Sequence, residues 1–170
     1  MMERQSEYFS GLSFVARERY KQKVINAGLS NDPYCIECWH EQLDSSPDVK
    51  WSDMLTYMTE TPSDNTREAV KAWKGMLDGG CFMRAGWVHQ LKLCPFSNRE
   101  GEAFVAMGKV KHSQQVSASF LLPWIAVQKS GKILAVHCTC MAGLGEACSH
   151  IAAIISCLIN ATEVRRFLYF

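Results

Sequence analysis

The stretch that decides the fold of this chain is His137–His150, HCTCMAGLGEACSH, with three cysteines and two histidines in fourteen residues. Residues i and i+2 of a β-strand face the same way, so Cys138 and Cys140 point together from the end of an expected strand. A loop, MAGLGEA, follows, and its two glycines allow a tight turn. Cys148 lies just before an expected helix, and His150 lies in its first turn. The loop therefore brings two pairs of possible ligands together.

These four side chains suit zinc. Three thiolates and an imidazole make a tetrahedral ligand set that zinc prefers, and the N-terminus of a helix favours a thiolate at Cys148. Because the protein fills all four positions, no open position remains for water or substrate. We therefore predict one structural Zn²⁺ bound by Cys138, Cys140, Cys148 and His150. The alternative is a set of buried thiols beside a histidine at a helix start, since buried free cysteine is common.

The segment CTCMAGLGEACSHIAAII, residues 138–155, resembles a SWIM zinc finger, in which C-x-C on a strand pair is followed by C-x-H at a helix start. Three earlier segments, GLSFVARERYKQKV, ETPSDNTREAVKAWKGML and AGWVHQL, resemble more loosely the region before the finger in animal proteins with a YqaJ-like viral recombinase nuclease. In those proteins the nuclease follows the finger, whereas this sequence stops at EVRRFLYF. The resemblance implies nucleic-acid binding, with DNA as the first candidate, and we expect no nuclease activity.

The charge distribution is uneven. Residues 1–80 hold 9 Lys and Arg against 13 Asp and Glu, whereas residues 81–170 hold 9 against 4. The second region is therefore mildly basic, which permits an acidic partner such as nucleic acid. The predicted contact residues are Lys109, Lys111, Lys129, Lys132, Arg165 and Arg166. Two alternatives remain: these residues form an ordinary solvated face, or the finger supports a protein partner that contacts the N-terminal helices or the tail RRFLYF.

Other cysteines and histidines are weaker candidates. Cys35 and Cys38 form a C-x-x-C motif, but there is no βαβ pattern around them, and a metal would need further ligands. With His40 as a third ligand, a fourth would have to come from elsewhere, for example from Cys81, His89 or Cys94. We expect His137 to face away from the zinc. Cys157 lies on the same helix face as His150, but as a small apolar core residue it needs no metal.

We expect a non-catalytic protein without a small-molecule substrate, because the predicted zinc accounts for the histidines nearest the cysteines. The longest apolar run, Ile151–Ile159, is half of the roughly 18 residues that a membrane span needs, so no membrane is expected. No signal-peptide core is present, and the cysteines are clustered at short spacing, which favours a reducing compartment. We expect an intracellular protein, nuclear rather than cytoplasmic.

The N-terminal part has helical periodicity. One amphipathic helix is predicted over 10–24, with Leu12, Val15 and Arg19 on one arc and Phe14 beside it. Ser52 is placed to cap a second helix that runs to Met58. A third helix is predicted to start at Asp64 or Asn65 and to end at Gly79 and Gly80, with an apolar arc of Ala69, Val70, Trp73, Met76 and Leu77.

After residue 80 the pattern changes to β-strands. Two hairpins are predicted, one from 81–93 and 102–113 and the other from 124–128 and 133–140, followed by a buried helix over 148–160. The predicted fold is α+β: a helical region 1–80, then a β-rich region 81–170 that ends in a ββα finger at about 124–160. The tryptophans Trp73, Trp87 and Trp124 are expected in the core.

Overall fold

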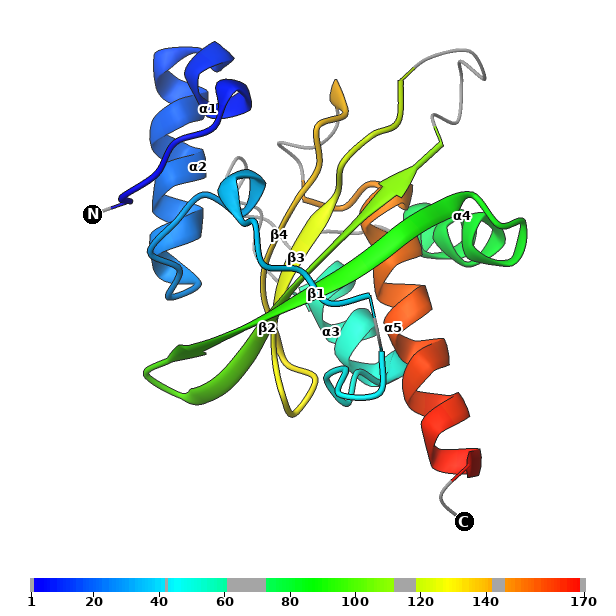
Figure 1. The fold of residues 1–170 in the computed structure, drawn as a ribbon. Helices are drawn as coiled ribbons and strands as arrows, with labels where there is room; N and C mark the ends of the chain where they lie inside the picture. Colours follow the sequence, from blue (N-terminus) through cyan, green and yellow to red (C-terminus); the bar gives the residue numbers. More distant parts are fainter. Residues whose placement is uncertain (1, 42, 61–72, 112–118, 142–145, 169–170) are drawn as a thin grey trace.

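The computed structural model describes residues 2–41, 43–60, 73–111, 119–141 and 146–168. Within them the chain is α+β, as predicted, with a four-stranded antiparallel sheet between two layers of helices (Figure 1). Helices α1 and α2 cover one face of the sheet, and α3, α4 and α5 lie on the other. Because helices cover both faces, both sides of the central strands are buried.

Two helices replace the single one predicted near the N-terminus. These are α1, Glu7–Gly11, and α2, Phe14–Asn26, and each begins at a serine whose side chain accepts a backbone N–H. The predicted apolar arc is wrong for Phe14, which is 76% exposed, and for Val15, which is 58% exposed, whereas Leu12 is half-buried against the core. The buried face of α2 instead carries Tyr20 and Val24, which pack against the sheet.

Helix α3, Trp51–Glu60, confirms the second predicted helix but not its cap. Ser52 lies inside the helix, and the Asp53 carboxylate accepts the Lys50 backbone N–H at 2.8 Å. A short 3₁₀ turn, η1, Pro33–Cys35, precedes this helix and begins at Asp32, whose side chain accepts the backbone N–H of Tyr34.

Helix α4, Trp73–Arg84, runs through Gly79 and Gly80, so the prediction that these glycines end it is wrong. A Cβ on Gly79 would lie 2.5 Å from the Cβ of Ala152 in α5, so glycine here permits close contact between the two helices. Trp73 is 57% exposed, which corrects its predicted place in the core. Trp87 is half-buried and Trp124 is fully buried. Four predicted residues, Asp64, Asn65, Ala69 and Val70, lie outside the described residues.

The strands follow one another in the sheet in the order β1–β2–β3–β4, all antiparallel. They are β1, Val88–Asn98; β2, Gly101–Val110; β3, Trp124–Gln128; and β4, Ile133–His137. The second hairpin is confirmed, although β4 ends before the first metal-ligand candidate. The first hairpin is confirmed with different limits, because residues 81–84 belong to α4 and residues 95–98 extend β1.

Alternation along the strands divides the core between the two faces. Ile125 and Val127 of β3 face the layer of α3, α4 and α5, whereas Trp124 and Ala126 face α1 and α2. Helix α5, Ser149–Leu168, belongs to the layer of α3 and α4 and packs its apolar residues against this face of the sheet. It is longer than predicted, since it continues through residues 161–168, and its expected core residues Ile151, Ile154, Ile155, Leu158 and Ile159 are all buried. The division of the chain at residue 80 stays a prediction.

Candidate metal centre

The four predicted ligands come together where β4 meets α5. Cys138 directly follows β4, Cys148 directly precedes α5, and His150 lies in the first turn of that helix. The three sulfur atoms and a ring nitrogen of His150 all lie within 4.8 Å of one another. Cys138 is fully buried, His150 is buried, and Cys140 and Cys148 are half-buried. This Cys₃His cluster can hold a metal ion.

The geometry fits a tetrahedral ion. Zinc binds sulfur at about 2.3 Å and nitrogen at about 2.0–2.1 Å, which places neighbouring ligand atoms roughly 3.8 Å apart. From the observed separations of at most 4.8 Å, the four atoms need to close by only about 1 Å. The donor set, soft thiolates with one imidazole, matches zinc as well.

The three thiols interact strongly even without an ion. Hydrogen bonds from the Cys138 and Cys148 thiols lower the pKa of Cys140 well below its usual range, and His150 adds to this. The hydrogen bond to Cys140 in turn raises the pKa of Cys138. A hydrogen bond with Cys138 lowers the pKa of Cys148, but the bond with Cys140 and burial outweigh it and raise that pKa to about 12. The cluster therefore favours a thiolate at Cys140, stabilised by its two thiol neighbours.

Neighbouring elements pack closely around the cluster. The ring centroids of Phe82 in α4 and His150 lie 6.0 Å apart. A Cβ on Gly75 of α4 would lie 2.8 Å from the carbonyl oxygen of Ala147, so α4 rests directly on the backbone before Cys148. Between the first two ligands, the Thr139 hydroxyl accepts the backbone N–H of Leu122 at 3.0 Å.

A buried ion pair that the sequence did not predict links this centre to α2. The Lys23 ammonium lies 2.5 Å from a carboxylate oxygen of Glu146, in the segment between Cys140 and Cys148. Both side chains are less than a tenth exposed, and the Tyr57 hydroxyl donates to the same carboxylate at 3.5 Å. The only sequence signal was a lysine on the face of α2 that carries Tyr20 and Val24.

His137 faces away from the cluster, as predicted. It lies on the α1 and α2 side of the sheet, with Nε2 at 2.7 Å from the Tyr8 hydroxyl and Nδ1 at 3.5 Å from the Lys23 ammonium. Burial lowers the pKa of His137 to about 3, and the Lys23 charge contributes to this. The ring is therefore neutral at physiological pH and serves as a hydrogen-bonding core residue.

The other cysteines lie outside the cluster. Among the described residues, no second group of three or more cysteine, histidine or acidic side chains converges on Cys35 and Cys38. Cys38 is exposed, and its charge contributes to a raised pKa at nearby Cys94, although burial is the larger cause. Cys157 is not one of the converging ligands, and burial raises its pKa to about 11.

The six predicted contact residues do not form one surface. Lys129 and Lys132 flank the β3–β4 turn, whereas Lys109 lies at the opposite end of β2, as the strand register requires. Lys132 pairs with Glu100 at 3.0 Å, and Arg166 pairs with Asp48 at 3.1 Å. Lys129 and Arg165 also have a carboxylate within 4.0 Å. In the part of the chain that the structure describes, no carboxylate forms an ion pair with Lys109 or Lys111.

Comparisons with models of protein families, with curated proteins and with solved structures found no match. Among the described helices, none is both long enough and apolar enough to cross a membrane.

Proposed function

We propose that the Cys₃His cluster binds one structural Zn²⁺ and that the chain is a non-catalytic, zinc-stabilised binding module of SWIM type. The observation that carries this proposal is the convergence of Cys138, Cys140, Cys148 and His150 to within 4.8 Å. With four protein ligands, the ion has no open position at which to activate water or substrate. Its role is to tie the end of β4 to the start of α5.

Zinc binding of this kind contributes directly to folding. Apparent binding free energies in zinc-finger peptides are about 10–16 kcal/mol, and this free energy stabilises the folded state because the unfolded chain has no preformed site. We therefore expect chelation to loosen the junction between β4 and α5 first. The helix α5 packs on α3, α4 and the sheet, so its displacement would expose the larger part of the core.

Metal content tests this proposal directly. Elemental analysis should find about one zinc per chain in the purified protein, retained in Cys38→Ser and lost in Cys148→Ser. Cys38 is exposed and outside the cluster, so it is a matched control. A second zinc ion that is lost in Cys38→Ser would identify Cys35 and Cys38 as ligands of a second site. A well-folded protein without zinc would contradict the proposal.

For the partner, we propose nucleic acid. Two observations support this: the excess of basic residues in the second region of the chain, and the exposed Lys109 and Lys111, whose charges no described carboxylate neutralises. The carboxylate partners of Lys129, Lys132, Arg165 and Arg166 argue against a broad duplex-binding surface. Nucleic-acid binding should weaken steeply with salt in a gel-shift titration.

A protein partner is the second candidate, favoured by the end of α5. Phe167 is 85% exposed and Leu168 is 75% exposed there, and Val164 one turn earlier is 49% exposed. Exposed apolar groups that gather on one helix end favour contact with another protein. Binding to a partner that persists at moderate salt and is lost in Phe167→Ser would identify this surface as the functional one.

A further inference from the structure

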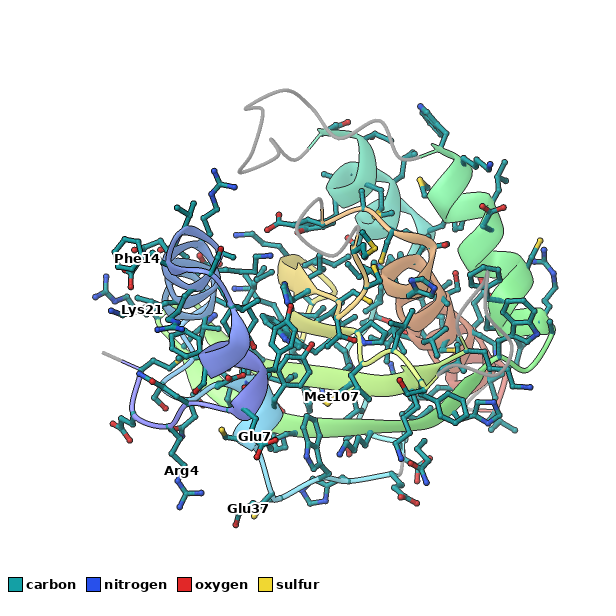
Figure 2. All side chains as sticks on the ribbon, turned by 90° about the horizontal axis from the view of Figure 1, so that it is seen from above. Arg4, Glu7, Phe14, Lys21, Glu37 and Met107 are labelled. Carbon is teal, nitrogen blue, oxygen red and sulfur yellow. The ribbon has the colours of Figure 1, made fainter. Side chains whose placement is uncertain are left out.

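A groove of about 470 Å³ lies on the α1 side of the sheet, within the size range of small-ligand sites. Its walls come from α1, η1, the segment that follows η1, and strands β1 and β2. Figure 2 labels Glu7 of α1 and Met107 of β2, two of the residues that line it. Thr139, between two of the proposed zinc ligands, lines it as well.

Three aromatic side chains line the groove, and the polar group of each already forms a hydrogen bond within the protein. The Tyr8 hydroxyl bonds to His137 at 2.7 Å, and the Tyr34 hydroxyl donates to the Leu122 carbonyl at 2.7 Å. The Trp39 indole N–H donates to the Ile36 carbonyl at 2.6 Å. These rings are therefore fixed in place. Tyr8 and Tyr34 meet edge to face, with ring centroids 5.1 Å apart and planes at 67°, so a planar group that stacks on one of them contacts the edge of the other.

Two lysines supply positive charge to the same groove. The Lys92 ammonium lies 4.4 Å from the centre of the Trp39 ring, which positions it by a cation–π contact. Lys109 lines the groove from the neighbouring strand. Burial lowers the pKa of Lys92, and the Lys109 charge lowers it further, whereas the charge of Glu41 opposes this shift in part, so Lys92 lies within the electrostatic influence of both groups. Glu7 is the acidic residue among those that line the groove.

A β-bulge in β1 places Lys92 on the same face as Lys109. The register changes between the pair His89–Lys109 and the pair Lys92–Met107, so β1 holds one extra residue there. Without it, Lys92 would face the apolar layer of α5, because a shift of one residue exchanges the two faces of a strand. The extra residue places Gln90, which lines the groove, at φ 50°. Such strained positions concentrate at binding sites.

We propose that this groove binds a nucleotide of a single-stranded nucleic acid, with the base stacked on the face of Tyr34 and against the edge of Tyr8, and a phosphate held by Lys92 and Lys109. This inference rests on the nucleic-acid binding of the proposed function and assigns it a site and a strand state. Duplex DNA keeps its bases stacked on one another, so an aromatic groove selects unpaired bases.

Two observations favour a nucleotide over an acidic or phosphorylated peptide. Phosphopeptide sites are built around arginine clusters, whereas the residues that line this groove include lysines and no arginine. A peptide could also pair with the free edge of β1, but His40 already forms a bridge to Leu93 on that edge, with hydrogen bonds of 2.8 Å in both directions.

The test measures binding of fluorescent oligo-dT and oligo-rU to the zinc-loaded protein by anisotropy across a salt series. Lys109→Gln should weaken binding about tenfold and reduce the slope of log K against log salt by about 0.7. Lys132→Gln is the matched control, because Lys132 is an exposed lysine paired with Glu100 at the other end of the sheet. An oligonucleotide with abasic sites should bind about fivefold more weakly or worse, since it retains phosphates but lacks stacking bases.

The outcomes separate the groove from the broader proposal. If no oligonucleotide binds, single-stranded or duplex, the nucleic-acid function fails and the groove assignment with it. If the protein binds but Lys109→Gln behaves like Lys132→Gln, only the groove assignment is overturned. Equal affinity for duplex and single strands, equal binding of the abasic oligonucleotide, or displacement by a phosphopeptide in preference to oligo-dT would also overturn it. A preference between oligo-dT and oligo-rU decides between DNA and RNA.

Discussion

Replacing Lys23 by methionine tests whether α2 stabilises the metal centre from the opposite side of the sheet. The Lys23 ammonium is 2.5 Å from the Glu146 carboxylate, and the two side chains are 8% and 9% exposed. Glu146 lies in the segment between Cys140 and Cys148, at φ 60°, so its position affects how the ligands meet. Lys23→Met keeps the apolar stem and removes the ammonium group, together with its contact to His137 Nδ1 at 3.5 Å.

The expected loss of stability is about 3–5 kcal/mol, because the substitution leaves the Glu146 carboxylate buried without the ammonium group that lies against it. Removing both charges, by combining Lys23→Met with Glu146→Gln, should cost less than the two single losses together. The coupling energy from this double-mutant cycle should be about 0.5–3 kcal/mol. Zinc affinity should also fall about 10–100-fold, as when a group that orients metal ligands is lost.

Urea unfolding of the zinc-loaded protein measures the stability, and competition with a chromophoric chelator measures the zinc affinity. Lys21→Met is the matched control, since Lys21 lies on the same helix and pairs with Glu18 at 3.9 Å, with side chains 37% and 52% exposed. That exposed pair should contribute no more than about 1 kcal/mol. If Lys23→Met costs no more than Lys21→Met, or the cycle is additive, the buried pair does not support the metal centre.

Three further predictions concern the packing of the helices and one buried thiol. Gly79→Ala should lower stability by about 1–3 kcal/mol, because the new Cβ would lie 2.5 Å from the Cβ of Ala152. Gly80→Ala is the control in the same urea assay: its Cβ would lie 3.5 Å from the Arg84 side chain, so the substitution should be neutral or stabilising. Tyr20→Phe should cost about 1–3 kcal/mol, because the Tyr20 hydroxyl donates to buried Asp32 at 2.6 Å, whereas the exposed Phe14→Ser should change stability by less than about 0.5 kcal/mol. Cys157, with its pKa raised to about 11 by burial, should be alkylated slowly at neutral pH and faster as the pH rises toward 11. Mass spectrometry measures the rate, with exposed Cys38 as the control, and equal rates for the two thiols at neutral pH would contradict the prediction.

The metal centre and its nearest elements could be predicted because their determinants are local. The C-x-C and C-x-H spacings place the ligands in pairs, and the hairpin of β3 and β4 follows from two short apolar runs around KSGK. Helix α5 follows from its apolar residues at helical spacing. In each case, residues close in sequence determine the structure, so no knowledge of the rest of the fold was needed.

Features set by distant partners could not be predicted. The buried face of α2 is decided by packing on the sheet, where Tyr20 meets Trp124 with ring centroids 6.1 Å apart. Gly79 looks like a helix end by sequence, but the close approach of α5 makes it an interior residue. The carboxylates that pair with Lys132 and Arg166 are likewise far away in the sequence. Charge counts along the chain cannot show such neutralisation.

The proposed zinc site and the proposed nucleotide groove share a wall. Thr139 accepts the Leu122 N–H at 3.0 Å, and the Leu122 carbonyl accepts the Tyr34 hydroxyl at 2.7 Å. This series of contacts runs from the metal ligands to one of the stacking rings without involving Lys92 or Lys109. Disturbing it should therefore change how the base is held and leave the phosphate contacts intact.

Thr139→Val removes the hydroxyl and keeps the shape of the side chain, so the Leu122 N–H loses its acceptor at a cost of about 1–3 kcal/mol in stability. Zinc content should stay at one ion per chain, and oligo-dT should bind more weakly with an unchanged salt slope, because the number of phosphate contacts stays the same. Thr139→Ser, which keeps the hydroxyl, should behave like the unaltered protein. A reduced salt slope in Thr139→Val would mean that the phosphate contacts of Lys92 and Lys109 also depend on the hydrogen bonds of Thr139 and Leu122. Unchanged affinity would mean that Tyr34 does not hold the base.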